Sequence, residues 1–415
     1  MKKIFFIAWI CILLQSDFLA QEGGSYYTRY GLGDFYYSYT ARRLGMGELG
    51  IAASDRDFLS SLNPASWNQM RLTRFETGLI YKGSVESSTQ SEAFFSQTVF
   101  SGMLIGFPVS HENGIGVVTG IVPYSNVNYE TSQQMDSNFV DQYTLSYKGE
   151  GGLSKAFIGL SYRLPFDFSI GSSFEYYTGK IQYTTKFDFV STSTFYDGSY
   201  IKEYYYHGVG FTVGLISSNI GKALGVEKIK DLRVGITFSS QVSLSTDTVS
   251  SSSTSVGVVQ NSTQSYKTKL PFRLGVGLSM NWDENYDFIL DYLFMPLSQF
   301  EQNNIPGKNM RDAYKLSLGL EHSIQRPGSQ SFWEHVMWRA GISYEQTQYI
   351  FNGNGINQAS VYAGLSVPMG FDNSVDFGFQ YGKRGTTENN LLSENIYKFS
   401  ISLSIGELWF IRQER

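Results

Sequence analysis

The chain has 415 residues, and its 32 Lys and Arg against 37 Asp and Glu give a net charge of −5. This acidic balance excludes the basic surface that nucleic-acid binding needs. Charged residues make up 17% of the chain and aromatic residues 16%, which excludes both a disordered chain and a charge-rich coiled coil. What remains is an aromatic, glycine-rich chain that favours β-structure.

The N-terminus has the pattern of a secretory signal peptide. Two lysines follow Met1, and an unbroken apolar run covers residues 4–14. This run is too short to span a bilayer, which needs about 20 residues, but it suits a signal peptide. We therefore predict a signal peptide over residues 1–20, cleaved after Ala20. The only cysteine, Cys11, lies within it, so the mature chain is expected to have no disulfide and no thiol-bound metal.

Apolar residues alternate with small or polar residues along most of the chain from about residue 72. The alternation is found at residues 166–176, 272–280, 314–321, 338–344, 361–369, 375–381 and 399–405. A soluble β-sandwich also alternates in this way. However, many segments approach the roughly 9–11 residues that cross a membrane as a tilted strand. Their polar face is rich in Gly and Ser, which favours a transmembrane barrel with a lumen.

Short turns alternate with longer polar connectors, as they do in outer-membrane barrels. The strands between them number about fourteen, so we predict an all-β, antiparallel transmembrane barrel over residues 71–410, with a tail at residues 411–415. An even number of strands places both termini on the periplasmic side of a Gram-negative outer membrane. The Ser- and Thr-rich tract at residues 246–265 lacks a hydrophobic pattern, and we predict that it is a mobile outer loop.

Residues 21–70 do not alternate, and they are more than a simple barrel needs before its first strand. Residues 41–50 read Ala-Arg-Arg-Leu-Gly-Met-Gly-Glu-Leu-Gly, and Asn63-Pro64-Ala65 follows. Glycine and small residues let a backbone pack closely inside a narrow lumen. We therefore predict an N-terminal hatch, or plug, over residues 21–70.

The Arg-x-x-Gly-x-Gly spacing and the Asn-Pro-Ala before the first strand resemble the FadL-type outer-membrane transporters of long-chain fatty acids and other hydrophobic compounds. The chain is similar to the divergent members of Bacteroidetes-like lineages, which include PorV-type secretion accessory proteins. The resemblance implies a closed barrel whose hatch blocks the lumen, and a lateral portal at a kink in the third strand. Here that strand, residues 115–129, contains Gly120 and Pro123.

Proline has no N–H for the strand ladder, so Pro123 predicts a local break in pairing. The break is either the lateral portal, with Gly120, or a bulge near the membrane rim without a role in transport. Asn63, Pro64 and Ala65 are expected to fix the turn from the hatch to the first strand.

Four hatch residues are candidate ligand-binding residues. Arg42 and Arg43 could pair with a fatty-acid carboxylate, or they could bridge to acids of the barrel wall and hold the plug in place. Phe35 and Tyr36 are expected to line an apolar pocket.

The four histidines are isolated and form neither an H-E-x-x-H motif nor a metal-ligand spacing. We therefore expect no catalytic residue, no metal, no cofactor and no enzymatic activity. The leading hypothesis is the transport of hydrophobic compounds, such as fatty acids, across the outer membrane. The alternatives are a PorV-like accessory barrel that acts through a secretion-system protein, and a general diffusion porin. The expected partners are outer-membrane lipid and a hydrophobic small molecule, without nucleic acid.

Overall fold

The computed structural model describes residues 21–22, 24–137, 140–189, 196–221, 225–254, 257–323, 332–370 and 373–408. The predicted signal peptide at residues 1–20 and the predicted tail at residues 411–415 lie outside these ranges. Within them, no helix has both the length and the hydropathy to cross a membrane.

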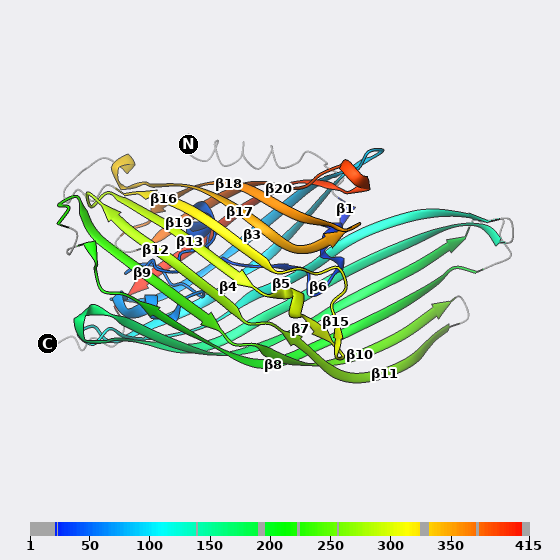
Figure 1. Cartoon of the computed structure of the whole chain (residues 1–415), viewed down its shortest axis with the longest axis horizontal. Coiled ribbons are helices and arrows are strands. Elements are labelled where there is room, and N and C mark those ends of the chain that lie inside the picture. The colour runs from blue at the N-terminus through cyan, green and yellow to red at the C-terminus, as the bar shows by residue number, and fades with distance from the viewer. Residues whose placement is uncertain are drawn as a thin grey trace, which may run out of the picture.

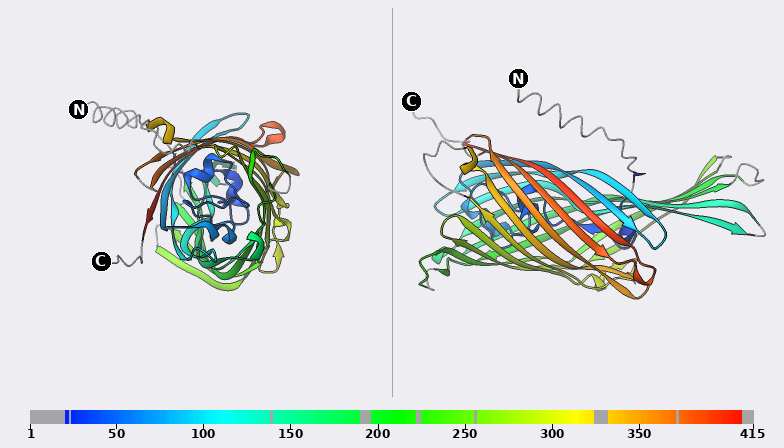
Figure 2. Two further views of the ribbon diagram at one scale, coloured as in Figure 1. Left: turned by 90° about the vertical axis from the view of Figure 1, so that its left-hand side faces the viewer. Right: turned by 90° about the horizontal axis from the view of Figure 1, so that it is seen from above.

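A single antiparallel sheet closes on itself as a barrel (Figures 1 and 2). Two strands are each interrupted once. β9 (Ile229–Ser239) continues as β10 (Val242–Thr254), since both pair with β8, and β11 (Gly257–Leu270) continues as β12 (Arg273–Trp282). Counting each interrupted strand once gives the fourteen strands that the sequence predicts. β20 (Ser393–Glu407) pairs with β3 (Thr73–Ser87) and closes the barrel.

The other long strands follow in chain order around the barrel. They are β4 (Glu92–Ser110), β5 (Ile115–Ser137), β6 (Val140–Arg163), β7 (Ser169–Phe189), β8 (Gly198–Ile216), β13 (Tyr286–Met295), β16 (Ala313–His322), β17 (Met337–Phe351), β18 (Asn354–Pro368) and β19 (Ser374–Gly385). The connectors contain η3 (Pro165–Asp167), η4 (Leu297–Gln299), β14 (Glu301–Gln302), β15 (Ile305–Pro306), η5 (Phe332–His335) and η6 (Glu388–Asn390).

The two faces of the wall are inverted relative to a soluble protein. Phe174 and Ile158 face outward with 58% and 55% of their surface exposed, whereas Glu175 and Lys155 face the lumen and are buried. An apolar outer face and a polar interior are what a barrel in lipid requires. The period-2 pattern of the sequence therefore has its apolar side outside.

The predicted loop at residues 246–265 is wrong, because these residues belong largely to β10 and β11. Thr246, Thr248 and Ser250 point inward and are buried, and the Thr246 and Thr268 hydroxyls lie 2.8 Å apart. These strands project, with β5 to β8, well past the rest of the barrel (Figures 1 and 2). A projecting strand has no lipid to face, so it needs no apolar side and its sequence carries no hydrophobic alternation.

The two described chain ends lie at opposite ends of the wall. β20 ends beside the start of β3, at the end of the barrel that carries the short turns. Gln21, by contrast, pairs with Phe95 near the other end of β4. The prediction of two periplasmic termini therefore fails for the described N-terminal end, because this end fills a free strand edge described below.

We predict that Phe174→Arg destabilises the barrel by about 2–4 kcal/mol in a bilayer, because it places a charge on the lipid-facing side. The temperature of the heat-induced gel-mobility shift in lipid vesicles measures this. Gln264→Arg is the matched control, since Gln264 is exposed on the projecting strand β11. Equal stability of the two variants would contradict a lipid-facing outer wall.

Candidate functional site: a plugged lumen beside an opening in the wall

Residues 24–72 lie inside the barrel (Figure 2). Their short elements are η1 (Tyr26–Arg29), β2 (Asp34–Phe35), α2 (Ala41–Gly45) and η2 (Pro64–Gln69). Two glycines of the Arg-x-x-Gly-x-Gly spacing set how closely α2 approaches the wall. A Cβ at Gly45 would lie 3.0 Å from the Gly364 Cα, and one at Gly47, whose φ is +86°, would lie 2.2 Å from the Ser317 Oγ.

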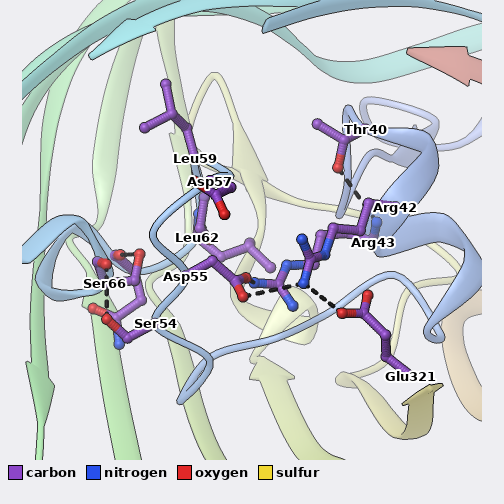
Figure 3. A network of polar contacts seen from close by, with 12 residues as sticks. Thr40, Arg42, Arg43, Ser54, Asp55, Asp57, Leu59, Leu62, Ser66 and Glu321 are labelled. Carbon is purple, nitrogen blue, oxygen red and sulfur yellow. Dashed lines mark hydrogen bonds and ion pairs between the residues drawn. The ribbon is translucent and has the colours of Figure 1, made fainter. Parts of the chain in front are cut away.

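The two arginines of α2 bind carboxylates (Figure 3). The Thr40 hydroxyl caps α2 by accepting a hydrogen bond from the Arg43 N–H. The Arg42 Nη2 lies 2.7 Å from the Glu321 Oε1 on the wall and 3.2 Å from the Asp55 Oδ1 on the plug, while Arg43 pairs with Asp55. Arg42 thus bridges to an acid of the wall, as the plug-holding alternative expects, whereas Arg43 pairs within the plug. Binding of a ligand carboxylate by Arg42 or Arg43 stays a prediction.

Two other plug acids tie the plug to the wall. Glu48 pairs with Lys315 and, at 2.8 Å, with Lys398. Asp34 accepts from Arg384 at 2.8 Å and from Lys82 at 3.1 Å. Burial alone would raise the pKa of Glu48, but the attraction of the two lysines outweighs it and lowers that pKa to about 2. The carboxylate therefore stays charged at neutral pH.

The remaining hatch motif is structural. Asn63 is fully buried and begins η2; its Oδ1 accepts from the Ala65 N–H at 3.0 Å, and its Nδ2 donates to the Ile51 carbonyl at 2.7 Å. A Cβ at Gly171, on the wall, would lie 2.4 Å from the Pro64 carbonyl carbon. The Asn-Pro-Ala turn thus packs directly against the barrel.

Phe35 does not line an apolar pocket in the described part of the chain, and Tyr36 borders two small cavities, one of them shared with Phe35. Phe35 packs edge-to-face on Tyr124 at 5.5 Å, and the Tyr36 N–H donates to the Tyr124 carbonyl. The cavity that they border has about 40 Å³, near the volume of one water molecule. It is otherwise lined mostly by charged and amide side chains, among them Asp34 and Arg384. The apolar pocket predicted at Phe35 is therefore not found there, because the plug acids and their wall partners fill this space. Tyr36 also borders the second cavity, together with Leu62, Val122 and Pro123.

The backbone ladder of the wall has an opening between β4 and β5, which the Gln97 side chain crosses by hydrogen bonds to the Asn126 and Asn128 side chains. The pairing of β4 with β5 stops at Met103 and Ile121. Beyond this point β4 remains paired with β3, and β5 remains paired with β6. In the β5–β6 ladder the register shifts between Pro123 and Ser125, and Tyr124 turns into the lumen, where it is buried. The kink predicted at Pro123 therefore lies where the wall separates.

Glycines flank the opening. Gly102 has φ +108°, and a Cβ there would lie 2.5 Å from the Ile121 carbonyl oxygen; a Cβ at Gly120 would lie 2.6 Å from the Met103 carbonyl oxygen. On β6, Gly151 and Gly152 have φ of +114° and +159° opposite the shifted residues of β5. Gly120 thus belongs to the last tightly paired stretch before the opening.

The N-terminal segment occupies the opening. β1 (Gln21–Glu22) pairs in parallel with Phe95 and Ser96 of β4. β2 pairs with Ser125 and Asn126 of β5. A cavity of about 420 Å³ lies next to these two pairings. It is lined by Ser96, Gln97, Thr98, Asn126, Val127, Asn128, Lys148, Glu150 and Gly151.

A buried guanidinium beside the bulge was not among the predicted site residues. Arg273 is 6% exposed, and it makes a single long hydrogen bond, 3.4 Å to the Ser239 Oγ. Among the buried Arg and Lys of the described chain it is the one without an ion pair. With Lys155, Pro123 and Tyr124 it lines a small cavity. In the sequence Arg273 is one of many polar residues at inward positions, so no local signal distinguishes it.

The neighbouring acid is already saturated. Glu175 accepts from Lys155 at 2.8 Å, from the Tyr177 hydroxyl at 2.6 Å and from the Thr212 hydroxyl at 2.9 Å. Lys155, Arg273 and Glu175 together carry one uncompensated positive charge in the lumen. Within the described residues, no group of three or more His, Cys, Asp or Glu could hold a metal ion.

Fold and site together define a closed, fourteen-stranded antiparallel β-barrel with an N-terminal plug. The chain matches the BamG family model over residues 1–414, and it belongs to the BamG family. No curated protein matches its sequence.

Solved structures share the fold at low sequence identity. The toluene transporter TbuX of Ralstonia pickettii has a TM-score of 0.59 at 13% identity, covering 90% of this chain and 99% of that one. The monoaromatic hydrocarbon channel CymD has a TM-score of 0.58 at 16% identity, covering 90% and 98%. A FadL homologue of Pseudomonas aeruginosa has a TM-score of 0.57 at 10% identity, covering 88% and 98%.

We predict that Glu48→Gln destabilises the folded barrel by about 3 kcal/mol, because it removes the buried carboxylate that pairs with Lys315 and Lys398. Urea unfolding in lipid vesicles measures this at pH 7. The exposed turn variant Glu112→Gln is the matched control, and equal unfolding midpoints for the two variants would contradict the anchoring role of Glu48.

The loss of stability caused by Glu48→Gln is expected to depend on pH. The pKa of Glu48 falls from 4.5 to about 2 on folding, so its contribution to stability is complete above pH 4.5 and is lost as the pH falls toward 2. The stability difference between wild type and Glu48→Gln should therefore shrink over this range. A difference that is constant from pH 6 to 2.5 would contradict it.

Proposed function

We propose that this protein is an outer-membrane barrel that passes a hydrophobic, fatty-acid-like amphiphile between its lumen and the lipid through the opening between β4 and β5. The observation that carries the proposal is the loss of β4–β5 pairing after Met103 and Ile121, at a level where β4 stays paired with β3 and β5 with β6. Lipid cannot satisfy free backbone N–H and C=O groups, so a barrel in a membrane normally has no open edge. An opening that is kept despite this cost points to a use for it.

Arg273 supports an acidic head group on the passing molecule. A buried guanidinium without an anion is costly, and this one lies beside the bulge at Pro123 and Tyr124. A single carboxylate would neutralise the surplus charge of Lys155, Arg273 and Glu175 through charge-assisted hydrogen bonds. The named relatives support the hydrophobic part of the molecule, since two of them are described as a toluene transporter and a monoaromatic hydrocarbon channel.

We predict that the purified barrel retains a fatty acid, seen by native mass spectrometry, and that Arg273→Met weakens this binding at least tenfold. A good charged hydrogen bond contributes about 1.5–3 kcal/mol, and tenfold corresponds to about 1.4 kcal/mol. Arg273→Lys should retain most of the binding because it keeps the charge.

Toluene binding serves as the matched ligand control, because toluene has no acidic group and should be insensitive to Arg273→Met. Equal fatty-acid binding by wild type and Arg273→Met would contradict the head-group assignment. Absence of any bound or transported hydrophobic compound from the wild type would contradict the transport proposal itself.

A second candidate is an accessory barrel that acts through a protein partner, such as a secretion-system protein. The observation that favours it is the long sheet of β5 to β8, β10 and β11, which projects past the rest of the barrel (Figure 1). Crosslinking in intact membranes followed by pull-down discriminates the two. Two results together would favour the accessory role. The barrel would bind no hydrophobic compound, and it would capture a stoichiometric protein partner that is lost when the β10–β11 hairpin is shortened.

A further inference from the structure

We propose that the free edge of β11, on the sheet that projects past the rest of the barrel, pairs with an extended segment of another polypeptide by β-strand addition. The proposal goes beyond the passage of an amphiphile through the wall and does not depend on it. It gives the second candidate function a place and a mode of partner binding. Three features of the described chain carry it: the ladders of β11, a strand that this edge already holds, and the composition of the edge.

β11 is the outermost strand on one side of the projecting sheet (Figure 1). It pairs with β10 along its length, whereas on its other side the ladder with β14 covers Thr268 and Lys269 alone. Among the described strands, none pairs with residues 257–266 on that side. The exposed residues along this stretch include Gly257, Val258, Val259, Gln264 and Ser265. An exposed strand edge is a template for pairing with another chain.

The edge of β11 already holds a short strand of the same chain. β14 pairs with it in antiparallel orientation, and the Asn303 N–H donates to the Lys267 carbonyl at 3.0 Å. Asn303 and Asn304 have φ of +55° and +59°, so the chain turns away there and the added strand ends. The Lys267 carbonyl thus faces the edge. Because backbone groups alternate in direction along a strand, those of Ser265 face the same edge beyond the end of β14.

The edge of β11 lacks the charges with which natural proteins protect exposed strand edges. Residues 257–266 contain no charged residue and no proline, and Val258 and Val259 expose 71% and 62% of their surface. The opposite edge of the projecting sheet, on β5, differs, since residues 130–137 include Glu130 and Asp136. Of the two edges of this sheet, the neutral one is therefore the one suited to strand addition.

The composition of this edge also indicates the chemistry of the partner. In strand addition, main-chain hydrogen bonds give affinity and alternate side chains give specificity. Gln264 and Ser265 lie on one side of a bulge in the β10–β11 register after Ser250, and Val258 and Val259 lie on the other. Hydroxyl, amide and β-branched side chains pair well with such residues across strands. The partner that fits is therefore an extended, uncharged segment rich in Ser, Thr and Val.

A second copy of this chain does not fit the edge. Two copies in one membrane point the same way across it, so a two-fold axis between them runs along the membrane normal. Such an axis keeps the two β11 strands running in the same direction and turns opposite faces of their sheets to the same side. Paired residues of a ladder have their side chains on one face, so the two edges do not form a common sheet. The partner is therefore a different polypeptide.

Photo-crosslinking in intact outer membranes tests the edge on the full chain. The photoreactive residue p-benzoylphenylalanine, in place of Gln264 or of Val258, should crosslink to one segment of one other protein. The two crosslinked sites should lie about six residues apart, as in a continuous ladder, and mass spectrometry of the crosslinked peptides measures this. Crosslinks to a second copy of this chain, to a lipid or glycan, or to unrelated sites of several proteins would overturn the proposal. The absence of any crosslink to protein would do the same.

A proline on the edge tests whether the backbone makes the contact. Ser265→Pro removes an edge-facing N–H, and proline is tolerated on edge strands. It should lower the crosslinking yield of the probe at Val258 at least about fivefold, because one backbone hydrogen bond to the partner is lost. An unchanged yield would overturn strand addition. Gln264→Lys, which leaves the backbone intact and places a charge on the edge, should also lower the yield, and it provides the same test if the proline variant fails to fold.

Ser132→Pro is the matched control on the other edge of the sheet. The Asn128 N–H and carbonyl face that edge, where they contact the Thr28 hydroxyl, and those of Ser132, further along β5, face the same way. This variant should keep the wild-type yield, and an equal loss with Ser132→Pro would overturn the assignment to β11. Fatty-acid binding should be the same in these variants and the wild type, so a failure of this proposal is distinguishable from a failure of the transport proposal.

Discussion

The requirement that every backbone N–H and C=O be paired governs this molecule more than any side-chain contact. A barrel meets it by closing β20 onto β3, which leaves no edge for lipid to cover. The wall departs from it between β4 and β5, and there the N-terminal segment provides partners for Phe95 and Ser96 of β4 and for Ser125 and Asn126 of β5. The plug is therefore part of the wall as well as the filling of the lumen.

Ion pairs hold the interior together as backbone hydrogen bonds hold the wall together. Buried ions are tolerated only when they are paired, and the lumen pairs acids of the plug with bases of the wall at Glu48 and Asp34, and the reverse at Arg42. Because the plug contributes acids at two of these ion pairs and a base at the third, the pairs fix one orientation of the plug. Among the described residues, Arg273 is the single buried guanidinium without an anion, and this is why the head-group proposal rests on it.

The strands in lipid could be read from the sequence because lipid requires an apolar residue at every second position. The projecting parts of the same strands could not, since water imposes no such pattern on residues 246–265. In the hatch, Asn63 and the glycines predict turns and close packing, because these features depend on the local sequence. The partners of Arg42 could not be named, because Glu321 is 279 residues away and a sequence does not show which acids face the same lumen. The sequence predicted the kink at Pro123. It did not show that β1 and β2 pair with β4 and β5 where the β4–β5 ladder is missing.

The distance along the chain between the plug and its anchors has a consequence for assembly. Ser25 contacts Glu394 across 369 positions, and Asp34 contacts Arg384 across 350. Residues near the start of the described chain are thus fixed in part by some of the last, so the partners of the plug are complete only when the final strands exist. Contacts of such separation form late and slowly. The N-terminal segment can therefore be anchored fully only when β20 meets β3, and the event that completes the wall also completes the contacts of the plug.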